Sequence, residues 1–139
     1  MEKQDFTIDV NREKMDLEKY TSLFYLMDFW MKAMEDGKKV SSFFTERKWH
    51  KVAIYGMGAA GKHLYRQLQD SPVQVLYTMD RKKVCYQNQE YELDKAFEML
   101  PAPEVLVVTP IMEYQSIKDK MKEKTSCRIL SLEEVILSL

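Results

Sequence analysis

The chain has 139 residues, of which 45% are hydrophobic and 31% charged, and its formal net charge is −1. Such a composition is typical of a globular domain with one core, and the balanced charge argues against a nucleic-acid partner. No apolar run approaches the roughly 20 residues that cross a bilayer. The charged start predicts a cytoplasmic chain without a signal peptide. The two cysteines are predicted to be free thiols, and with only two histidines no metal site is expected.

The N-terminal third predicts a helical arm. Residues 1 to about 14 are polar and predict no regular structure, whereas a strong helical pattern runs from about Met15 to Asp36. Two apolar rows follow this helix. One row has heptad spacing and the other lies beside it: Leu17, Tyr20, Phe24, Met27, Met31 and Met34, then Leu23, Leu26 and Trp30. One row can cover the rest of the chain and leave the other for a second subunit. We therefore expect a homodimer through this helix, and we expect charges at Leu23 and Leu26 to break it.

A second short helix is expected at 41–46, and the most informative stretch, 52–61, follows it. A buried strand runs into the pattern G-x-G-x-x-G, which then opens a helix to about Leu68. This order is typical of a dinucleotide-binding unit. Gly56 allows the sharp turn, Gly58 allows a pyrophosphate to approach the backbone, and Gly61 allows close packing of the helix on the sheet. The free N–H groups of the helix N-terminus would face the phosphates.

A second strand is predicted at 73–79 and ends at an acidic residue. Asp80 comes 19 residues after Gly61, where a carboxylate can accept hydrogen bonds from an adenosine ribose. The same carboxylate repels a 2′-phosphate, which favours NAD over NADP. The basic run Arg81-Lys82-Lys83 would attract that phosphate instead. Because Asp80 lies nearest the strand end, we expect NAD to bind more tightly.

The remaining elements complete a parallel sheet. Residues 81–89 are polar and turn-like, a third strand is expected at 90–93, and Asp94 is expected to cap a helix to Leu100. Strands at 105–108 and 128–130 flank a helix, and Ser131 opens a last one. The fold class is thus predicted to be α/β: a Rossmann-like doubly wound parallel sheet of about five strands in the order 3-2-1-4-5. Residues 1–49 form its N-terminal helical arm and residues 50–139 its nucleotide-binding domain.

Two residues at the end of the fourth strand are candidates for ligand contact. Thr109 and Pro110 follow the strand at 105–108, beside the point where the strand order reverses. Ligands bind at such switch points in open α/β sheets. The same two residues are also explained by a helix that has Thr109 as its N-cap and Pro110 at its first position. Ligand contact and helix capping are compatible.

The sequence evidence for catalysis is weaker than that for nucleotide binding. Tyr-x-x-x-Lys, the proton relay of short-chain dehydrogenases, occurs at Tyr91–Lys95 and at Tyr114–Lys118. About one match is expected by chance in a chain with 8 tyrosines, and no serine lies at the required distance upstream. His63 lies on the helix that follows the glycines and is either solvated or, with Lys62, close enough to neutralise a phosphate.

The chain resembles a known group of small Rossmann-type domains in bacterial polysaccharide-biosynthesis loci. The resemblance rests on Ile54-Tyr55-Gly56-Met57-Gly58, Leu64-Tyr65, Met79-Asp80, Val107-Val108-Thr109-Pro110 and 129–135. It rests also on the lead-in, a helix from Tyr20 to Trp30 followed by Val40–Phe44. Members of that group stand alone or are joined to glycosyltransferases and sugar methyltransferases, and they are related to the N-terminal part of nucleotide-sugar dehydratases. The resemblance implies the fold and a setting in polysaccharide or nucleotide-sugar metabolism, with a glycosyltransferase as a partner.

These observations predict a nucleotide-binding module, with NAD(H) or NADP(H) as ligand and a sensing or regulatory role. The alternatives are a minimal sugar-nucleotide oxidoreductase or epimerase, and an interaction module without a ligand. We expect no catalysis by the isolated chain, because too few residues remain to enclose a nicotinamide. The predicted cofactor-binding residues are Gly56, Met57, Gly58, Ala59, Ala60, Gly61, Asp80, Arg81, Thr109 and Pro110.

Overall fold

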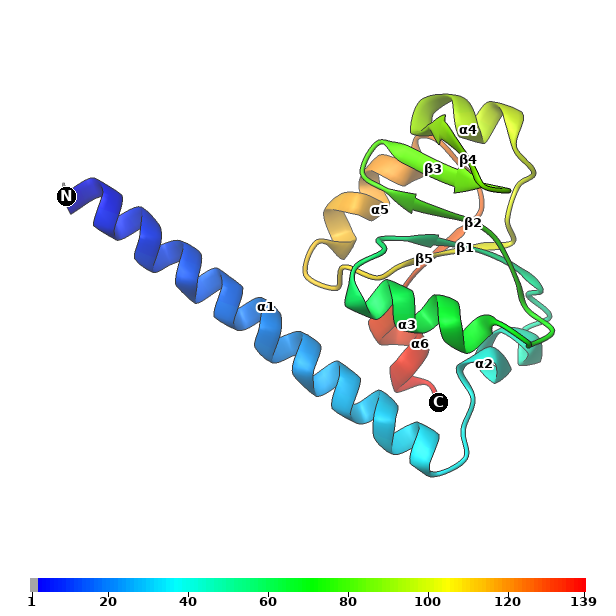
Figure 1. The fold of residues 1–139 in the computed structure, drawn as a ribbon, viewed down its shortest axis with the longest axis horizontal. Helices are drawn as coiled ribbons and strands as arrows, with labels where there is room; N and C mark the ends of the chain where they lie inside the picture. The colour runs from blue at the N-terminus through cyan, green and yellow to red at the C-terminus, as the bar shows by residue number, and fades with distance from the viewer. Residues whose placement is uncertain (1–2) are drawn as a thin grey trace.

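The computed structural model describes residues 3–139, with side chains from residue 11 onward, as an α/β fold with a long N-terminal helix (Figure 1). The helices are α1 (Lys3–Glu35), α2 (Val40–Glu46), α3 (Ala59–Leu68), α4 (Leu93–Met99), α5 (Tyr114–Lys122) and α6 (Leu132–Leu137). The strands are β1 (Lys51–Tyr55), β2 (Gln74–Asp80), β3 (Lys83–Tyr86), β4 (Gln89–Glu92), β5 (Val105–Val108) and β6 (Arg128–Ser131).

The strands form one six-stranded sheet in the order β4-β3-β2-β1-β5-β6. Strands β2, β1, β5 and β6 are parallel neighbours, in the relative order expected. The predicted count of five and the predicted all-parallel order are wrong, because β3 lies antiparallel between β2 and β4. The stretch expected to be a turn is therefore largely a strand.

Chain length explains this hairpin. Only eight residues separate the end of β2 from the start of β4, whereas a crossover between parallel strands needs about a dozen or more. The chain instead reverses twice through two-residue turns, one of them with positive φ at both Gln87 (50°) and Asn88 (63°). Positive φ at both central residues is the geometry that suits tight hairpins.

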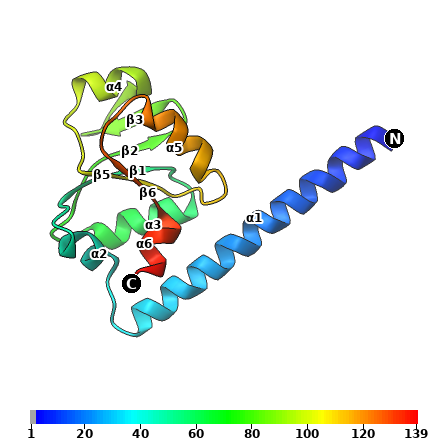
Figure 2. The ribbon, with the colours of Figure 1, turned by 180° about the vertical axis from the view of Figure 1, so that it is seen from behind.

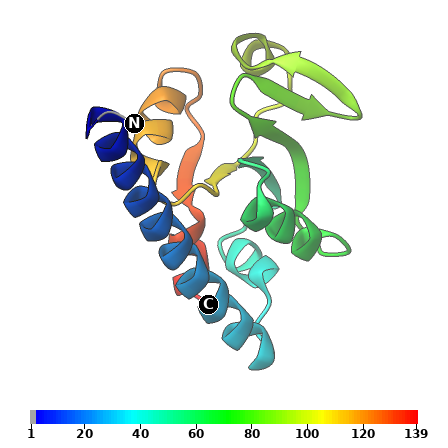
Figure 3. The same ribbon diagram turned by 60° about the vertical axis from the view of Figure 1, so that its left-hand side comes forward.

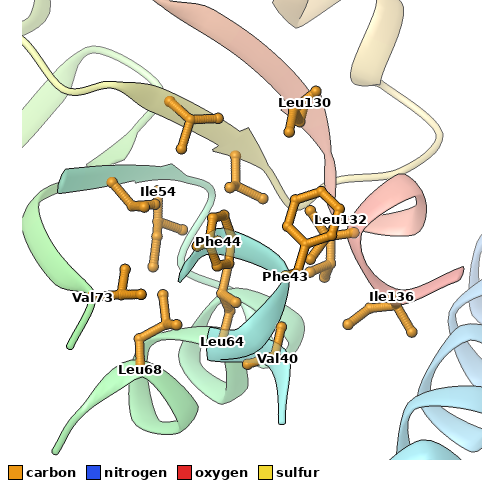
Figure 4. Close-up of a cluster of buried hydrophobic side chains, with 14 of the residues drawn as sticks. Val40, Phe43, Phe44, Ile54, Leu64, Leu68, Val73, Leu130, Leu132 and Ile136 are labelled. Carbon is orange, nitrogen blue, oxygen red and sulfur yellow. The ribbon is translucent and has the colours of Figure 1, made fainter. Parts of the chain in front are cut away.

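Each face of the sheet carries its own apolar cluster. In Figure 1, α4 and α5 lie on one face of the sheet, and α3 and α6 on the other. Figure 4 shows the cluster of the second face, where Phe44 and Leu64 are completely buried against Ile54 of β1. The opposite cluster centres on Ala53, Leu106 and Met121. Because β1 and β5 are buried on both faces, their positions are fixed firmly, and the loops at their carboxyl ends start from a rigid base.

The arm differs from expectation in two respects. Helix α1 begins at Lys3, so most of the segment predicted to lack structure is helical. Figure 2 shows its N-terminal half extending away from the rest of the chain, and Figure 3 shows its C-terminal half beside α6.

The expected dimer contacts require the row with Leu23 and Leu26 to face a second subunit, but in the structure this row packs against the core. Leu26 and Trp30 are buried in the cluster of α2, α3 and α6, and Leu23 is half-buried against it. Charges at Leu23 and Leu26 would thus damage the core of the protomer. The heptad row is the exposed one, with Phe24 65% exposed. Since both rows have helical spacing, only the tertiary structure distinguishes them.

Candidate functional site

The glycine loop between β1 and α3 is held by a backbone geometry that excludes side chains at two positions. Gly56 has φ +96°, and its N–H donates to the carbonyl of Met79 at 2.8 Å. A Cβ at Gly56 would lie 2.6 Å from both Pro110 Cδ and Thr109 Oγ1. A Cβ at Gly61 would lie 1.9 Å from the carbonyl oxygen of Gly56. The first and third glycines therefore allow the sharp turn and the close packing of α3 on the loop.

The middle glycine is different. A Cβ at Gly58 would meet nothing within 4 Å, so this position faces open space. Gly58 is the N-cap residue of α3 and provides no capping side chain. Its carbonyl accepts from the N–H of Lys62 at 3.0 Å, which leaves the N–H groups of Ala59, Ala60 and Gly61 without a partner inside the helix.

Thr109 fixes this loop from the neighbouring strand. Its buried hydroxyl donates to the carbonyl of Gly56 at 2.7 Å and lies 3.1 Å from the carbonyl oxygen of Tyr55. The expected N-cap role is wrong, because α5 begins only at Tyr114 and Pro110 lies in the preceding loop. A hydroxyl has one proton to donate, so Thr109 positions the glycine loop and keeps only acceptor capacity for a ligand.

A cleft of about 260 Å³ opens at the loop. Its walls come from three parts of the chain: the arm, the start of α3, and the segment after β5. They comprise Lys19, Tyr20 and Leu23, then Gly58–Gly61, and then Thr109–Glu113. The heptad spacing of α1 indicates packing and contains no sign of a ligand, so the sequence does not predict that α1 contributes to this cleft. The titratable side chains at this cleft are those of Lys19, Tyr20 and Glu113.

Asp80 lies at the same end of the sheet. It is exposed and directly follows Met79, whose carbonyl is bonded to Gly56. Burial of the Tyr55 side chain, and secondly the negative charge of Asp80, raise the pKa of that tyrosine. Asp80 lines neither this cleft nor the larger cavity that Tyr55 lines, so a ribose at this carboxylate would lie at the open surface.

The larger cavity, of about 810 Å³, lies beyond Tyr55. Cationic side chains dominate its lining, with two acidic residues from the β4–α4 corner and one directly after α5: Arg81, Lys82, Lys83, Lys120 and Lys124 with Glu92, Asp94 and Glu123. Lys124 and Asp94 form an ion pair across it. The hydrogen bond from Lys124 lowers the pKa of Asp94. Arg81 thus belongs to a basic wall, and its φ of 55° is that of a residue in the turn between β2 and β3.

The two Tyr-x-x-x-Lys pairs do not line the glycine cleft. The Tyr114 hydroxyl donates to the Ile129 carbonyl at 3.2 Å, and the Lys118 ammonium lies 5.6 Å from the centre of the Tyr114 ring. Both residues line a separate hollow beside residues 126–130. Tyr91 lies on β4, where its hydroxyl is bonded to the Gln89 side chain. His63 faces a groove along α1. Neither pair is therefore placed to transfer a proton at the glycine loop.

No protein-family model matches the chain, and neither the curated proteins nor the solved structures include a significant match. Across residues 3–139, no helix combines the length and the apolar character that crossing a membrane requires. Within the same residues, no three or more His, Cys, Asp and Glu side chains gather in a way that could hold a metal ion. The site itself therefore has to support any functional proposal.

Proposed function

We propose that the chain is a nucleotide-binding module that holds the phosphates of NAD(H), or of NADP(H), at the N-terminus of α3. The observation that carries the proposal is the contrast between the three glycines: a Cβ is excluded by packing at Gly56 and Gly61, whereas Gly58 faces open space. The fold alone explains two of these glycines. Packing gives no reason for Gly58 to lack a side chain, whereas the close approach of a ligand would explain why glycine stands there.

The chemistry around Gly58 suits an anion. Three N–H groups at the start of α3 have no partner in the helix, and the helix dipole is positive at this end. Lys19 adds a positive charge from the opposite wall of the cleft. A cleft of about 260 Å³ is smaller than the ~300–1,000 Å³ of typical ligand sites. A dinucleotide would therefore extend past Asp80 toward the larger basic cavity.

The choice between the two cofactors depends on neighbouring residues of opposite charge. Asp80 at the strand end favours a free ribose hydroxyl, and hence NAD. Arg81 and the two lysines after it favour the 2′-phosphate of NADP. We favour NAD, because Met79, the residue directly before Asp80, is bonded to the glycine loop.

A sensing or regulatory role beside a glycosyltransferase, in polysaccharide or nucleotide-sugar metabolism, extends this proposal and rests on the sequence resemblance. A minimal oxidoreductase or epimerase is the second candidate, since Tyr20 and Glu113 line the glycine cleft and can hold protons. Turnover of a UDP- or dTDP-sugar that Tyr20→Phe abolishes, followed at 340 nm and by chromatography of the sugars, would favour the enzyme.

Calorimetric titration with NAD⁺, NADH, NADP⁺ and UDP-glucose tests the binding proposal. Gly58→Val should weaken binding of the preferred ligand by more than about tenfold, equivalent to ~1.4 kcal/mol, while the free energy of unfolding without ligand falls by no more than about 1 kcal/mol. Lys118→Ala, in a different hollow, is the matched control and should bind as the original chain does. Equal affinity of the original chain and Gly58→Val would contradict the site. If UDP-glucose binds and none of the dinucleotides does, the ligand of the site is a sugar nucleotide and not a dinucleotide.

A further inference from the structure

The exposed row of α1 is an unusual surface. Leu17, Tyr20, Phe24, Met31 and Met34 are 67%, 63%, 65%, 61% and 42% exposed. Their spacing of three and four residues, with half-buried Met27 between them, continues one heptad seam over 17–34. With roughly 200 Å² for each large side chain, the seam exposes about 600 Å² of mainly apolar surface. This area is at the upper end of the roughly 300–600 Å² that the largest apolar patch of a typical monomer exposes, and such patches are often functional.

The described side chains of the N-terminal half of α1 receive little packing from the rest of the protein. Every side chain from Asn11 to Ser22 is exposed, and Figures 1 and 2 show this half apart from the sheet and its helices. Isolated helices gain too little from propensity alone to persist, and tertiary packing of an apolar face normally stabilises them. A partner on the seam would provide that packing.

We infer that the seam pairs with the same helix of a second copy, in antiparallel orientation. Antiparallel pairing about the midpoint between Tyr25 and Leu26 brings all six seam residues into contact with seam residues of the partner subunit. Leu17 then faces Met34 of the partner subunit, and Tyr20 faces Met31 of the partner subunit. Phe24 faces Met27 of the partner subunit. About 1,200 Å² in total would be buried, which reaches the lower end of the range for specific interfaces.

Charges beside the seam favour this orientation over a parallel one. In the antiparallel register, Lys14 lies next to Glu35 of the partner subunit, and the two-fold symmetry repeats the pair. A parallel pairing continued past Leu17 would bring the two Glu13 side chains face to face at a seam position. The antiparallel pair avoids this opposition of two Glu13 carboxylates and adds two Lys14–Glu35 pairs.

A groove borders the seam on the side of α3. It has a volume of about 400 Å³ and lies between α1 and α3, with His63 and Gln67 on its far wall. Phe24, Met27, Met31 and Met34 line its near wall. A helix laid along the seam would therefore contact α3 as well as α1.

The oligomeric state of the full chain tests this inference independently of any nucleotide. Sedimentation equilibrium between 1 and 100 μM should give the mass of a dimer. Phe24→Glu should raise the dissociation constant at least a hundredfold, because the charge would be buried in the seam. The matched control is Tyr25→Glu, since Tyr25 is 67% exposed but lies off the seam. A monomeric original chain at 100 μM, or equal loss of dimer in both variants, would overturn the inference.

Disulfide trapping tests the orientation. In a background with Cys85→Ser and Cys127→Ser, tagged Leu17→Cys chains are mixed with untagged Met34→Cys chains and oxidised. Only the mixed species should cross-link, because two copies of residue 17 lie about 26 Å apart along the antiparallel pair. Cross-linking of Leu17→Cys chains to one another would show a parallel pair. A dimer without the mixed disulfide would refute the register.

Discussion

Replacing Gly61 with alanine should damage the fold, whereas the same change at Gly58 should not. A Cβ at Gly61 would lie 1.9 Å from the Gly56 carbonyl oxygen and 2.9 Å from its carbon. Close carbon–oxygen contacts occur at about 3.3–3.6 Å, so α3 and the loop must separate by more than about 1 Å. Both sides of the contact are backbone, and a change of side-chain rotamer cannot relieve it.

The expected cost follows from this overlap. Overpacking a core costs about 1–3 kcal/mol, and the rigid contact at Gly61 belongs at the upper end. The smaller entropy of an unfolded chain with alanine offsets about 0.4–1 kcal/mol of it. We therefore expect Gly61→Ala to lose about 2 kcal/mol of unfolding free energy. At about 2–4 °C per kcal/mol, the melting temperature should fall by about 4–8 °C.

Gly58→Ala is the matched control. Its Cβ enters open space, and the preference for glycine over alanine at an N-cap is offset by the same entropy gain. Its stability should remain within about 0.5 kcal/mol of the original chain. Urea unfolding followed by far-ultraviolet circular dichroism, without ligand, compares the three proteins. Equal stability of the two variants would refute the packing described for Gly61.

Thr109→Val should cost about 1–3 kcal/mol in urea unfolding, because a buried carbonyl of the glycine loop loses its donor, and Thr109→Ser should retain most of the stability. At pH 8, Ellman's reagent should modify exposed Cys85 well before Cys127, because burial raises the pKa of the Cys127 thiol; simultaneous reaction would contradict this burial. Lys124 lowers the pKa of Asp94, so their pair adds stability above about pH 4 and loses it as pH falls through the lowered pKa. Melting temperatures of Asp94→Asn should lack that acid-side loss, and identical pH profiles would refute it.

The sequence was sufficient where a pattern was local. The strand, glycines and helix at 51–68 occupy consecutive residues, and each has a strong local signal. The structure confirms the sharp turn at Gly56 and the close packing at Gly61. Ligand binding there remains a prediction.

The sequence was insufficient where a local signal is short or where distant segments decide the outcome. The strand Lys83–Tyr86 has one buried residue, Val84, and alternates too briefly to differ from a turn. Its pairing depends on the tight turns around it. Both rows of α1 are apolar, and packing against α2 and against α6, at the far end of the chain, decides which one is buried. The Thr109 hydroxyl donates to the Gly56 carbonyl, 53 residues earlier in the chain, and no local pattern predicts this bond.

That last separation has a consequence for the order of folding. Strand β1, α3 and β2 are contiguous, so they can associate early through local contacts. The glycine loop is fixed only when β5 has paired with β1 and Thr109 has reached the Gly56 carbonyl. Closing so long a loop is slow compared with local contacts. The phosphate-facing end of α3 should therefore gain its final shape among the last events of folding, and a nascent chain that ends before β5 would lack it.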